Sequence, residues 1–384
     1  MIDTKNITIL CKVVDNFGDI GFVYRLARAL TERDGQLRLR LIVSDLPAFA
    51  AIAPLVVPDK SEQTCYGWQI FDWNAADVCT RSFTRQPPAV ILECFQCGRP
   101  DWLESLLFDQ ATDGAKNDGF VQIANIDYLT AESYADDFHL LKSGTRSARV
   151  KKINVMPGFT AKTGGLILDN AFMRSKNTVR TQTTGDAPRT MTTVFFSYER
   201  DCTPLVQALA QFQAQRDIPV RVLVAAGKSR APFLSAWERA GKPFAAEPLP
   251  FLPQEDWDAL LCAADWNFVR GEDSLSRACL AGVPFVWQPY PQDEDYHIVK
   301  LAALNERLRP FFSPDAFAAY DAYTRDYALG KDSTDSLLHV LSFLPQLRKS
   351  FAAFADHLIA NGDLADHLLG WLDTLHNPSS RFIL

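Results

Sequence analysis

The stretch ITILCKVVDNFGDIGFVYRLARAL (residues 7–30) joins an apolar run to a helical pattern through a short polar turn. Its opening residues, 7–14, have the length and apolar character of a buried strand. Apolar residues then recur at helical spacing and give the following helix one apolar face: Ile20, Val23, Ala27 and Leu30. Strand–helix units of this kind build open α/β sheets, so the stretch predicts the fold class.

The turn inside this stretch carries two acids, Asp15 and Asp19, and two glycines, Gly18 and Gly21. It has the position of a phosphate-binding loop, but it lacks the GxGxxG spacing of a dinucleotide fold, and carboxylates repel a phosphate. Two interpretations stay open. Asp19 can cap the helix while Asp15 serves the turn. Alternatively, the two carboxylates bind an acceptor that is cationic or must lose a proton.

Further apolar runs continue the strand pattern on both sides of a polar segment. In the first half, strands are expected at residues 37–44, 88–95 and 119–129, and less clearly at 149–160. Residues 160–190 are rich in Thr, Gly and Asn and have the composition of a linker. In residues 190–291, strand and helix alternate four times and a strand closes the series. This pattern predicts a complete doubly wound domain with parallel strands.

The sequence therefore predicts two α/β domains of similar size. The first spans residues 1–175 and the second residues 176–364, and a helix at about residues 365–384 could cross back to the first domain. Ligands of open α/β sheets bind at the carboxyl ends of the strands. Two such edges facing across a cleft would suit an enzyme that brings a nucleotide-linked donor to a separate acceptor.

Composition narrows the class of protein. The 384 residues are 47% hydrophobic and 22% charged, which is typical of a globular protein. The net charge of −7 argues against a general nucleic-acid or membrane-surface binder. No apolar run approaches the ~20 residues that span a bilayer, and the N-terminus lacks the pattern of a signal peptide. The eight scattered cysteines indicate reduced thiols, so a cytoplasmic protein is expected.

Two groups of residues resemble metal or redox sites and are interpreted otherwise. Cys94 and Cys97 form a CxxC motif, but no second ligand pair at matching spacing is visible. We interpret them as buried or half-buried thiols without chemistry. Three consecutive acids at residues 293–295 are interpreted as first-turn residues of a helix, where the helix dipole favours negative charge.

The strongest local signal in the second half is the turn RGEDS (residues 270–274), which follows a strand and opens a helix. Such a turn points backbone N–H groups at whatever lies above the helix N-terminus, and these groups and the helix dipole suit a diphosphate. Glu272 could face a sugar hydroxyl or the acceptor. The alternative is a helix capped by Asp273 or Ser274 with no ligand.

Aromatic and polar residues follow three other strands of the second half. Tyr198 and Phe251 could sandwich a flat base or a ribose, and Tyr290 offers a ring face and a hydroxyl. Gln254 could bind a base edge through its amide, or could only begin a helix. For a single aromatic residue, core packing is the simpler interpretation, but several polar and aromatic strand ends at one edge favour a site.

Four motifs together carry a family resemblance: DNFGDIGFVYRLARAL (residues 15–30), PGFTAKTGG (157–165), FLPQEDWDALL (251–261) and RGEDSLSRACLAGVPFVWQPYPQ (270–292). Over essentially the whole chain, the sequence resembles the EarP family of protein-arginine rhamnosyltransferases. The resemblance implies the GT-B fold, with two Rossmann-like domains facing a central cleft. It also implies transfer of L-rhamnose from dTDP-β-L-rhamnose to one arginine of elongation factor P, with inversion and without a metal or other cofactor.

The resemblance also implies residue roles. The N-terminal domain would receive the acceptor, with Asp19 as general base, Asp15 beside it and the loop residues Asn16, Phe17 and Gly18 around it. The C-terminal domain would hold dTDP, with Glu272 as the other essential acid. The remaining donor-site residues would be Tyr198, Phe251, Gln254, Arg270, Gly271, Asp273, Ser274 and Tyr290.

Two alternative functions stay open. One is a GT-B glycosyltransferase that acts on a small-molecule or lipid-linked acceptor. The other is a nucleotide-sugar-binding protein without turnover. The acids of the first turn favour the arginine acceptor, because a guanidinium benefits from two carboxylates, whereas a sugar hydroxyl needs one base and a pure sensor needs none. No nucleic acid or membrane is expected as a partner.

Overall fold

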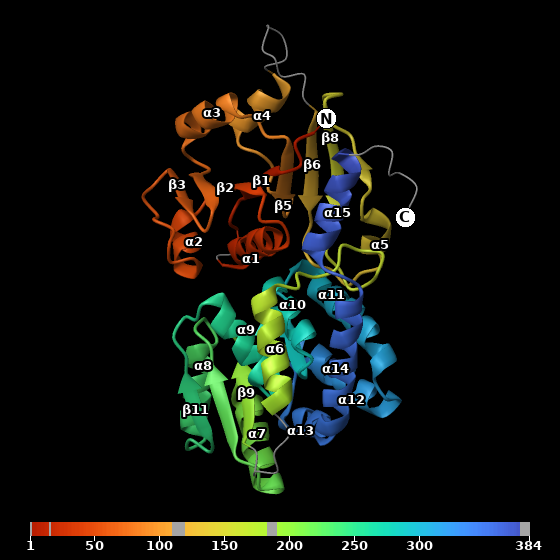
Figure 1. The fold of residues 1–384 in the computed structure, drawn as a ribbon. Coiled ribbons are helices and arrows are strands. Elements are labelled where there is room, and N and C mark those ends of the chain that lie inside the picture. The colour runs from red at the N-terminus through yellow and green to blue at the C-terminus, as the bar shows by residue number, and fades with distance from the viewer. Residues whose placement is uncertain (1, 15–16, 110–119, 183–189, 377–384) are drawn as a thin grey trace. The chain divides into compact units, whose positions relative to one another are not determined.

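The computed structural model describes residues 2–14, 17–109, 120–182 and 190–376. Contacts divide the chain into two compact units (Figure 1). Unit 1 comprises Met1–Asn170 together with Asn361–Leu384, and unit 2 comprises Ala171–Ala360. Each unit contains one sheet with helices, so each is described by itself.

Unit 1 has an eight-stranded sheet with the order β3-β4-β2-β1-β5-β6-β8-β7. Its strands are β1 Asn6–Cys11, β2 Arg38–Val43, β3 Glu62–Cys65, β4 Trp68–Asp72, β5 Val90–Cys94, β6 Val121–Ile126, β7 Lys142–Ser143 and β8 Val150–Val155. The central strands pair in parallel, and only the edge strands β3 and β7 run antiparallel to their neighbours. Parallel strands buried on both faces need helices on both sides.

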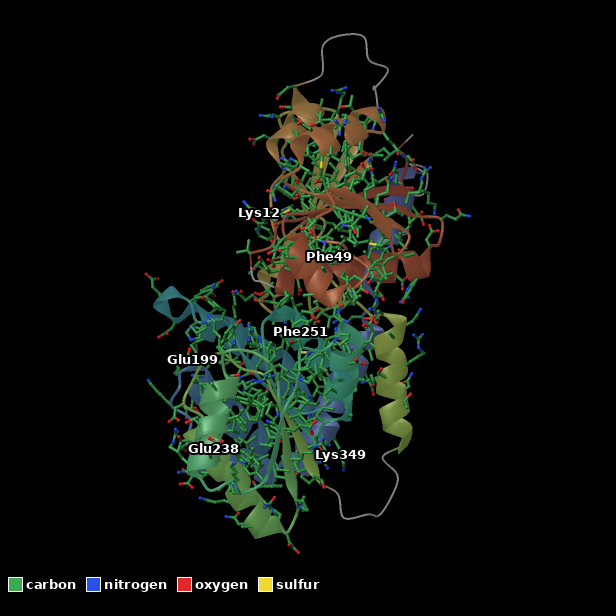
Figure 2. All side chains as sticks on the ribbon, turned by 90° about the vertical axis from the view of Figure 1, so that its left-hand side faces the viewer. Lys12, Phe49, Glu199, Glu238, Phe251 and Lys349 are labelled. Carbon is green, nitrogen blue, oxygen red and sulfur yellow. The ribbon has the colours of Figure 1, made fainter. Side chains whose placement is uncertain are left out.

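Two apolar cores cover the two faces of this sheet. The helices are α1 Gly18–Arg33, α2 Leu46–Ile52, α3 Ala76–Arg85, α4 Asp101–Phe108, α5 Tyr134–Phe138 and α15 Leu364–His376. One core joins the sheet to α1, α2 and the C-terminal helix α15, and includes the fully buried Phe49 (Figure 2). The other core joins the opposite face to α3 and α4 (Figure 1). The C-terminal helix therefore packs on the sheet formed by the N-terminal part of the chain.

Unit 2 has a five-stranded, fully parallel sheet with the order β11-β10-β9-β12-β13. Its strands are β9 Met191–Phe195, β10 Val220–Val224, β11 Ala245–Pro248, β12 Trp266–Arg270 and β13 Phe285–Gln288. The crossover helices are α7 Thr203–Arg216, α8 Arg230–Arg239, α9 Gln254–Ala263 and α10 Glu272–Ala281. The remaining helices are α6 Asn170–Gln182, α11 Tyr296–Leu308, α12 Pro314–Ala328, α13 Thr334–Ser342 and α14 Leu344–Ala360, with short 3-10 turns at Asp293–Asp295 and Arg309–Phe311.

The hairpin of β3 and β4 was not among the expected strands. β3 is a polar edge strand with the sequence EQTC, so it lacks the apolar run that marks a buried strand. Its turn nevertheless carries a local signal. Tyr66 and Gly67 both adopt positive φ, at 56° and 79°, which is the backbone of a two-residue hairpin turn.

The expectation of a polar linker over residues 160–190 is wrong for its described part. Residues 170–182 form helix α6, and Leu166 and Ile167 are buried. The fully buried Asp169 accepts hydrogen bonds from Arg25 and Arg28 of α1, at 3.3 and 3.4 Å. A composition rich in Thr, Gly and Asn misled the prediction because a buried ion pair, rather than apolar periodicity, fixes this segment. Residues 183–189 lie outside the described residues.

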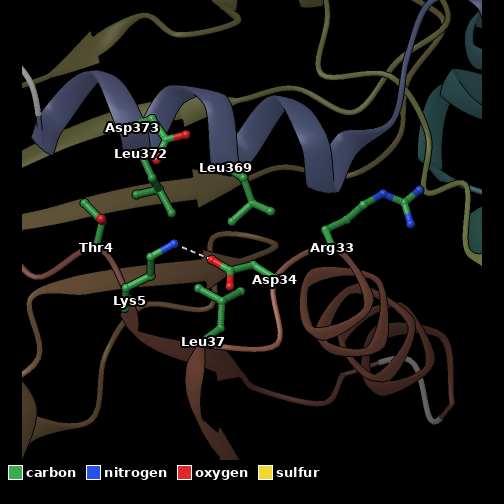
Figure 3. A pocket seen from close by; sticks show the side chains of 8 residues that line it. All are labelled: Thr4, Lys5, Arg33, Asp34, Leu37, Leu369, Leu372 and Asp373. Atoms are coloured by element: carbon green, nitrogen blue, oxygen red, sulfur yellow. Dashed lines mark hydrogen bonds and ion pairs between the residues drawn. The ribbon is translucent and has the colours of Figure 1, made fainter.

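A pocket in unit 1 lies at the amino ends of β1 and β2 (Figure 3). Its lining residues are Thr4, Lys5, Arg33, Asp34, Leu37, Leu369, Leu372 and Asp373. Both of its cations are already paired, Lys5 with Asp34 and Arg33 with Asp363 and Asp366. Ligands of parallel sheets bind at the opposite, carboxyl edge, so this pocket does not mark the site. Among the described residues, no helix is long and apolar enough to cross a bilayer.

Candidate active site

Both sheets have a point at which the strand order reverses, and the predicted site residues lie there. In unit 1, β1 leads to β2 on one side and borders β5 on the other. In unit 2, β9 leads to β10 on one side and borders β12 on the other. The loops after these strands separate at such a reversal and leave a crevice at the carboxyl edge. The turn before α1 and the turn before α10 occupy this position in their respective units.

Asp19 lies in the first turn of α1 and is almost fully buried, with 3% of its surface exposed. Its Oδ2 accepts a hydrogen bond from the backbone N–H of Val14 at 2.8 Å. The hydroxyl of Tyr128 donates to its Oδ1 at 3.4 Å. The N-cap residue of α1 is Phe17, and its side chain makes no capping hydrogen bond. Asp19 is therefore not the N-cap, which was the first of the two interpretations of this turn. A carboxylate placed inside a helix start and held at both oxygens is oriented for a ligand.

The neighbours of Asp19 in the turn were also predicted to bind the acceptor. Phe17 is 41% exposed, and Gly18 is half-buried as the first residue of α1. Asp15 and Asn16 lie outside the described residues, so the pairing of Asp15 with Asp19 stays a prediction.

Tyr128, Phe95 and Phe22 form a row of three aromatic rings at this edge, and sequence reasoning missed it. Phe95, directly after β5, stacks on Tyr128 with ring centroids 4.4 Å apart and planes at 19°. Phe22 of α1 packs edge-on against Phe95 at 5.0 Å. Phe95 and Tyr128 follow two neighbouring parallel strands. The rule that ligands bind at the carboxyl ends of such strands could therefore have identified both residues.

The thiols near this edge are poor nucleophiles. Burial raises the pKa of the Cys97 thiol to about 11, and burial raises the pKa of Cys11 and Cys94 well above the ordinary value. All eight cysteines are free. A high pKa keeps these groups protonated at neutral pH, which agrees with the interpretation of the CxxC motif as thiols without chemistry.

In unit 2, the turn before α10 presents backbone rather than acid side chains at the cap. Gly271 is the N-cap, with φ 68° and ψ 170°, and as a glycine it has no side chain with which to cap the helix. The Trp287 indole N–H donates to the carbonyl of Gly271 at 3.2 Å and fixes the turn. The N-cap position is therefore held by Gly271 and not by Asp273 or Ser274, which the ligand-free alternative proposed as caps. The backbone N–H groups and the dipole at such a helix start suit an anion.

Three aromatic rings and the guanidinium of Arg270 pack together beside the start of α10. The guanidinium carbon of Arg270 lies 4.5 Å from the ring centroid of Phe196 and 4.7 Å from that of Tyr198. Tyr290 packs edge-on against Tyr198 at 5.3 Å and is 64% exposed. The structure thus brings the predicted Arg270, Tyr198 and Tyr290 together, and it adds Phe196.

Gln288, which was not among the predicted residues, fixes the loop that carries Tyr198. It is the last residue of β13 and is 6% exposed. Its Oε1 accepts hydrogen bonds from the backbone N–H of Tyr198 at 2.9 Å and from the hydroxyl of Ser197. A buried glutamine in the otherwise apolar run PFVWQPYP was the signal that could have identified it.

The start of α9 belongs to the same edge of the unit 2 sheet. Gln254 is its first residue and is 9% exposed, while Phe251 in the preceding loop is 48% exposed (Figure 2). Trp257 of α9 packs edge-on against Phe196 at 5.2 Å, which ties this helix to the end of β9. The described part of the chain contains no group of three or more His, Cys, Asp or Glu side chains that could hold a metal ion.

Comparison with known proteins assigns the chain to a family. A family model described as Elongation-Factor P (EF-P) rhamnosyltransferase EarP matches residues 7–373. A protein-arginine rhamnosyltransferase of Pseudomonas putida is 32% identical and covers 94% of this chain and 97% of its own length. A protein-arginine rhamnosyltransferase of Shewanella oneidensis is also 32% identical, over 85% of this chain and 86% of its own length.

Solved structures agree on the fold. A structure from a study of EarP-mediated arginine glycosylation of elongation factor EF-P has a TM-score of 0.57 at 24% identity, covering 96% of this chain and 99% of its own. A UDP-glucose:anthocyanidin 3-O-glucosyltransferase in complex with UDP has a TM-score of 0.52 at 10% identity, covering 98% and 100%. The two parallel α/β sheets are those of the GT-B fold. The match of the family model over nearly the whole chain shows that this protein belongs to the EarP family, the rhamnosyltransferases of elongation factor P.

Proposed function

We propose that this protein transfers L-rhamnose from dTDP-β-L-rhamnose to an arginine side chain of elongation factor P, with inversion at the sugar carbon and without a metal ion. The observation that carries the proposal is the buried Asp19 at the carboxyl edge of unit 1, in a chain of the EarP family. The acceptor named for the curated relatives, a protein arginine, requires a base because its guanidinium is protonated. The eight free cysteines suit a cytoplasmic place of action.

The carboxylate of Asp19 suits the chemistry of an arginine acceptor. Free arginine has a pKa above ~12, so its nitrogens are protonated and poorly nucleophilic at neutral pH. A carboxylate holds a guanidinium by charge-assisted hydrogen bonds and can remove one proton as the new bond forms. Val14 and Tyr128 already fix both oxygens of Asp19, so this geometry exists before the acceptor binds. Asp15 would add a second carboxylate beside it.

The edge of unit 2 suits the donor. The amides at the start of α10 and the guanidinium of Arg270 would bind the diphosphate, and the rings of Tyr198, Phe251 and Tyr290 offer faces for the thymine base or the sugar. Gln254 would hydrogen-bond the base edge. Glu272, at the first position of α10, would act on the sugar or the acceptor nitrogen, and it is the second acid of the proposal.

The bonds of the proposed step balance as follows. Asp19 takes one proton from the arginine guanidinium, and the nitrogen lone pair forms a bond to the anomeric carbon of rhamnose. The bond from that carbon to the diphosphate oxygen breaks, and its electron pair leaves with dTDP. Attack opposite to the leaving group inverts the carbon. The helix N-terminus and Arg270 stabilise the negative charge that grows on the diphosphate, which is the role that a metal ion has in other transferases.

The experiment is the intact mass of elongation factor P after incubation with this protein and dTDP-β-L-rhamnose. The expected result is the gain of one deoxyhexosyl group, located on an arginine by fragmentation. Omission of dTDP-rhamnose, or its replacement by dTDP alone, is the control. If folded protein binds dTDP-rhamnose but leaves elongation factor P unchanged, the proposed acceptor is wrong, and a small-molecule or lipid-linked acceptor becomes the better hypothesis.

A further inference from the structure

Asp19 depends on a residue that lies far from it in the sequence. Val14, on its own turn, holds Oδ2, but the contact to Oδ1 comes from Tyr128 in the loop after β6. The two side chains differ in exposure, because Asp19 is 3% and Tyr128 is 39% exposed. The hydroxyl of Tyr128 therefore reaches from a half-exposed ring to a buried carboxylate.

The ring of Tyr128 is supported on one face by Phe95, which is itself packed against Phe22. Phe95 stacks on it with planes at 19°, and Phe22 of α1 packs edge-on against Phe95. Phe95 and the next residue, Gln96, both have positive φ, at 61° and 51°, which is unfavourable for residues with a side chain. Such backbone is kept where surrounding contacts determine it, and it is common at functional sites.

The loop that carries Tyr128 is tied to the same strained turn. The Gln96 side-chain amide donates to Asp127 at 2.8 Å, and the Asp127 carboxylate accepts the backbone N–H of Tyr128 at 2.8 Å. The backbone N–H of Phe95 donates to the carbonyl of Ile126 at 2.7 Å. Stacking, side-chain and backbone contacts thus all set the position of one hydroxyl relative to Asp19.

We infer that Tyr128 is a positioning residue for the proposed reaction: its hydroxyl orients the Asp19 carboxylate toward the acceptor guanidinium. This inference rests on the proposed function. A hydrogen bond to Oδ1 limits rotation of the carboxylate and so sets the direction in which it would meet the acceptor N–H groups. At 3.4 Å the contact is long, and catalytic hydrogen bonds commonly shorten when substrate binds. Tyr128 itself takes no proton in this scheme.

The test separates the hydroxyl from the ring. Tyr128→Phe keeps the stack on Phe95 and removes only the O–H, while Tyr128→Leu removes both. We expect Tyr128→Phe to lower kcat about tenfold, the size of one hydrogen bond to a charged group, with unchanged KM for both substrates. Phe95→Leu keeps the hydroxyl but removes its support, and a loss of about threefold in kcat is expected. Thermal melting checks that each variant is folded.

The matched control is Tyr66→Phe. Tyr66 also has a packed ring, against Trp68 and Tyr24, and its hydroxyl also makes one hydrogen bond, to the N–H of Leu55 at 3.2 Å. The same chemical change there is expected to leave kcat unaltered. A merely structural Tyr128 would behave like Tyr66, with full kcat in Tyr128→Phe and a loss only in Tyr128→Leu, and that pattern would overturn the inference.

The outcomes also distinguish the two proposals. If the wild-type chain modifies elongation factor P and Tyr128→Phe retains wild-type kcat, only the positioning role is rejected. A raised KM for the acceptor at unchanged kcat would likewise reject it, because the hydroxyl would then bind the acceptor rather than orient Asp19. If the wild-type chain gives no transfer, the proposed function itself fails.

Discussion

In unit 1, α1 starts a few residues after β1 and buries the carboxylate of Asp19 in its first turn; in unit 2, α10 starts directly after β12 with Gly271 as its cap. Both starts lie at a reversal of strand order, so the topology offers the same crevice twice. The difference is in what faces the crevice. One start presents a fixed negative side chain, and the other presents backbone amides beside a guanidinium.

This comparison shows how one fold serves two opposite charges. A helix N-terminus attracts anions, and in the proposed function unit 2 binds the diphosphate in that way, with Arg270 adding positive charge. In unit 1 the first turn of α1 instead carries the buried carboxylate of Asp19. A cationic acceptor and an anionic donor can therefore be assigned to different units by charge alone. The following changes test this division, from the largest expected effect to the smallest.

Removing the charge of Asp19 should have the largest effect. Asp19→Asn keeps the size and the contact from Val14 but cannot accept the guanidinium proton, so transfer should fall by about 1,000-fold, within the range for a general base. Binding of dTDP, measured by calorimetry, should be unchanged because the proposed donor site lies in unit 2. Asp59→Asn, an exposed acid of the same unit, is the control. Full activity of Asp19→Asn would reject its role as base.

Changing the acid at the start of α10 should come next. Glu272→Gln should lower kcat/KM for dTDP-rhamnose by about 100-fold, the lower range for a group that acts on the reacting atoms. Glu238→Gln, on the exposed face of α8 in the same unit (Figure 2), should have no effect. A kcat/KM for the donor that stays at the wild-type value would show that Glu272 only occupies the helix start.

Straining the donor turn should weaken donor binding and leave the acceptor unaffected. Gly271 has φ 68° and ψ 170°, a conformation that only glycine adopts readily, yet an added Cβ would meet no atom within 4 Å. Gly271→Ala therefore tests backbone strain without a clash, and the donor Kd should rise about tenfold, from a strain of ~1–2 kcal/mol. Gly144→Ala, with equal space and no positive φ, is the control. An equal loss of acceptor affinity would contradict the division of labour.

Replacing the guanidinium by an ammonium should have a small effect. Arg270→Lys keeps the charge but loses the flat contact with Phe196 and Tyr198, worth ~0.5–1 kcal/mol, so the donor Kd should rise about twofold to fivefold. Arg221→Lys, in an exposed ion pair with Glu247, should leave the donor Kd unaltered. A loss above 100-fold in Arg270→Lys would mean that bidentate contact with the donor, and not charge, dominates.

Chelation should have no effect. Because the proposed anion site consists of backbone amides and Arg270, EDTA should leave kcat at its untreated value. A loss of kcat that added Mg²⁺ restores would show that a cation, rather than the protein, neutralises the leaving diphosphate. The contrast between the two units would then have to include a metal ion.

The sequence predicted the part of this comparison that depends on local pattern. Apolar runs located the central strands of both sheets, and the glycine-bent turns placed Asp19 and Gly271 at strand ends. What it missed depends on contacts between distant segments. The polar edge strand β3 has no apolar run, and Asp169 is fixed by Arg25 of α1 rather than by its neighbours.

The same limit applies to the candidate site. Tyr128 is separated from Asp19 by more than a hundred residues, and only the adjacency of β5 and β6 in the sheet brings the loop into place. Gln288 likewise reaches Tyr198 across the sheet. Strand order decides such pairs, and a single sequence does not encode strand order as a local signal.

The central claim is that Asp19 and the donor site of unit 2 act on one arginine and one nucleotide sugar. The most direct measurement is a paired assay of wild type and Asp19→Asn, with dTDP binding by calorimetry and intact mass of elongation factor P on the same samples. We predict equal dTDP affinities, one added deoxyhexosyl group with wild type and none with Asp19→Asn. Modification of elongation factor P by Asp19→Asn at the wild-type rate, or none by either protein despite dTDP binding, would contradict the claim.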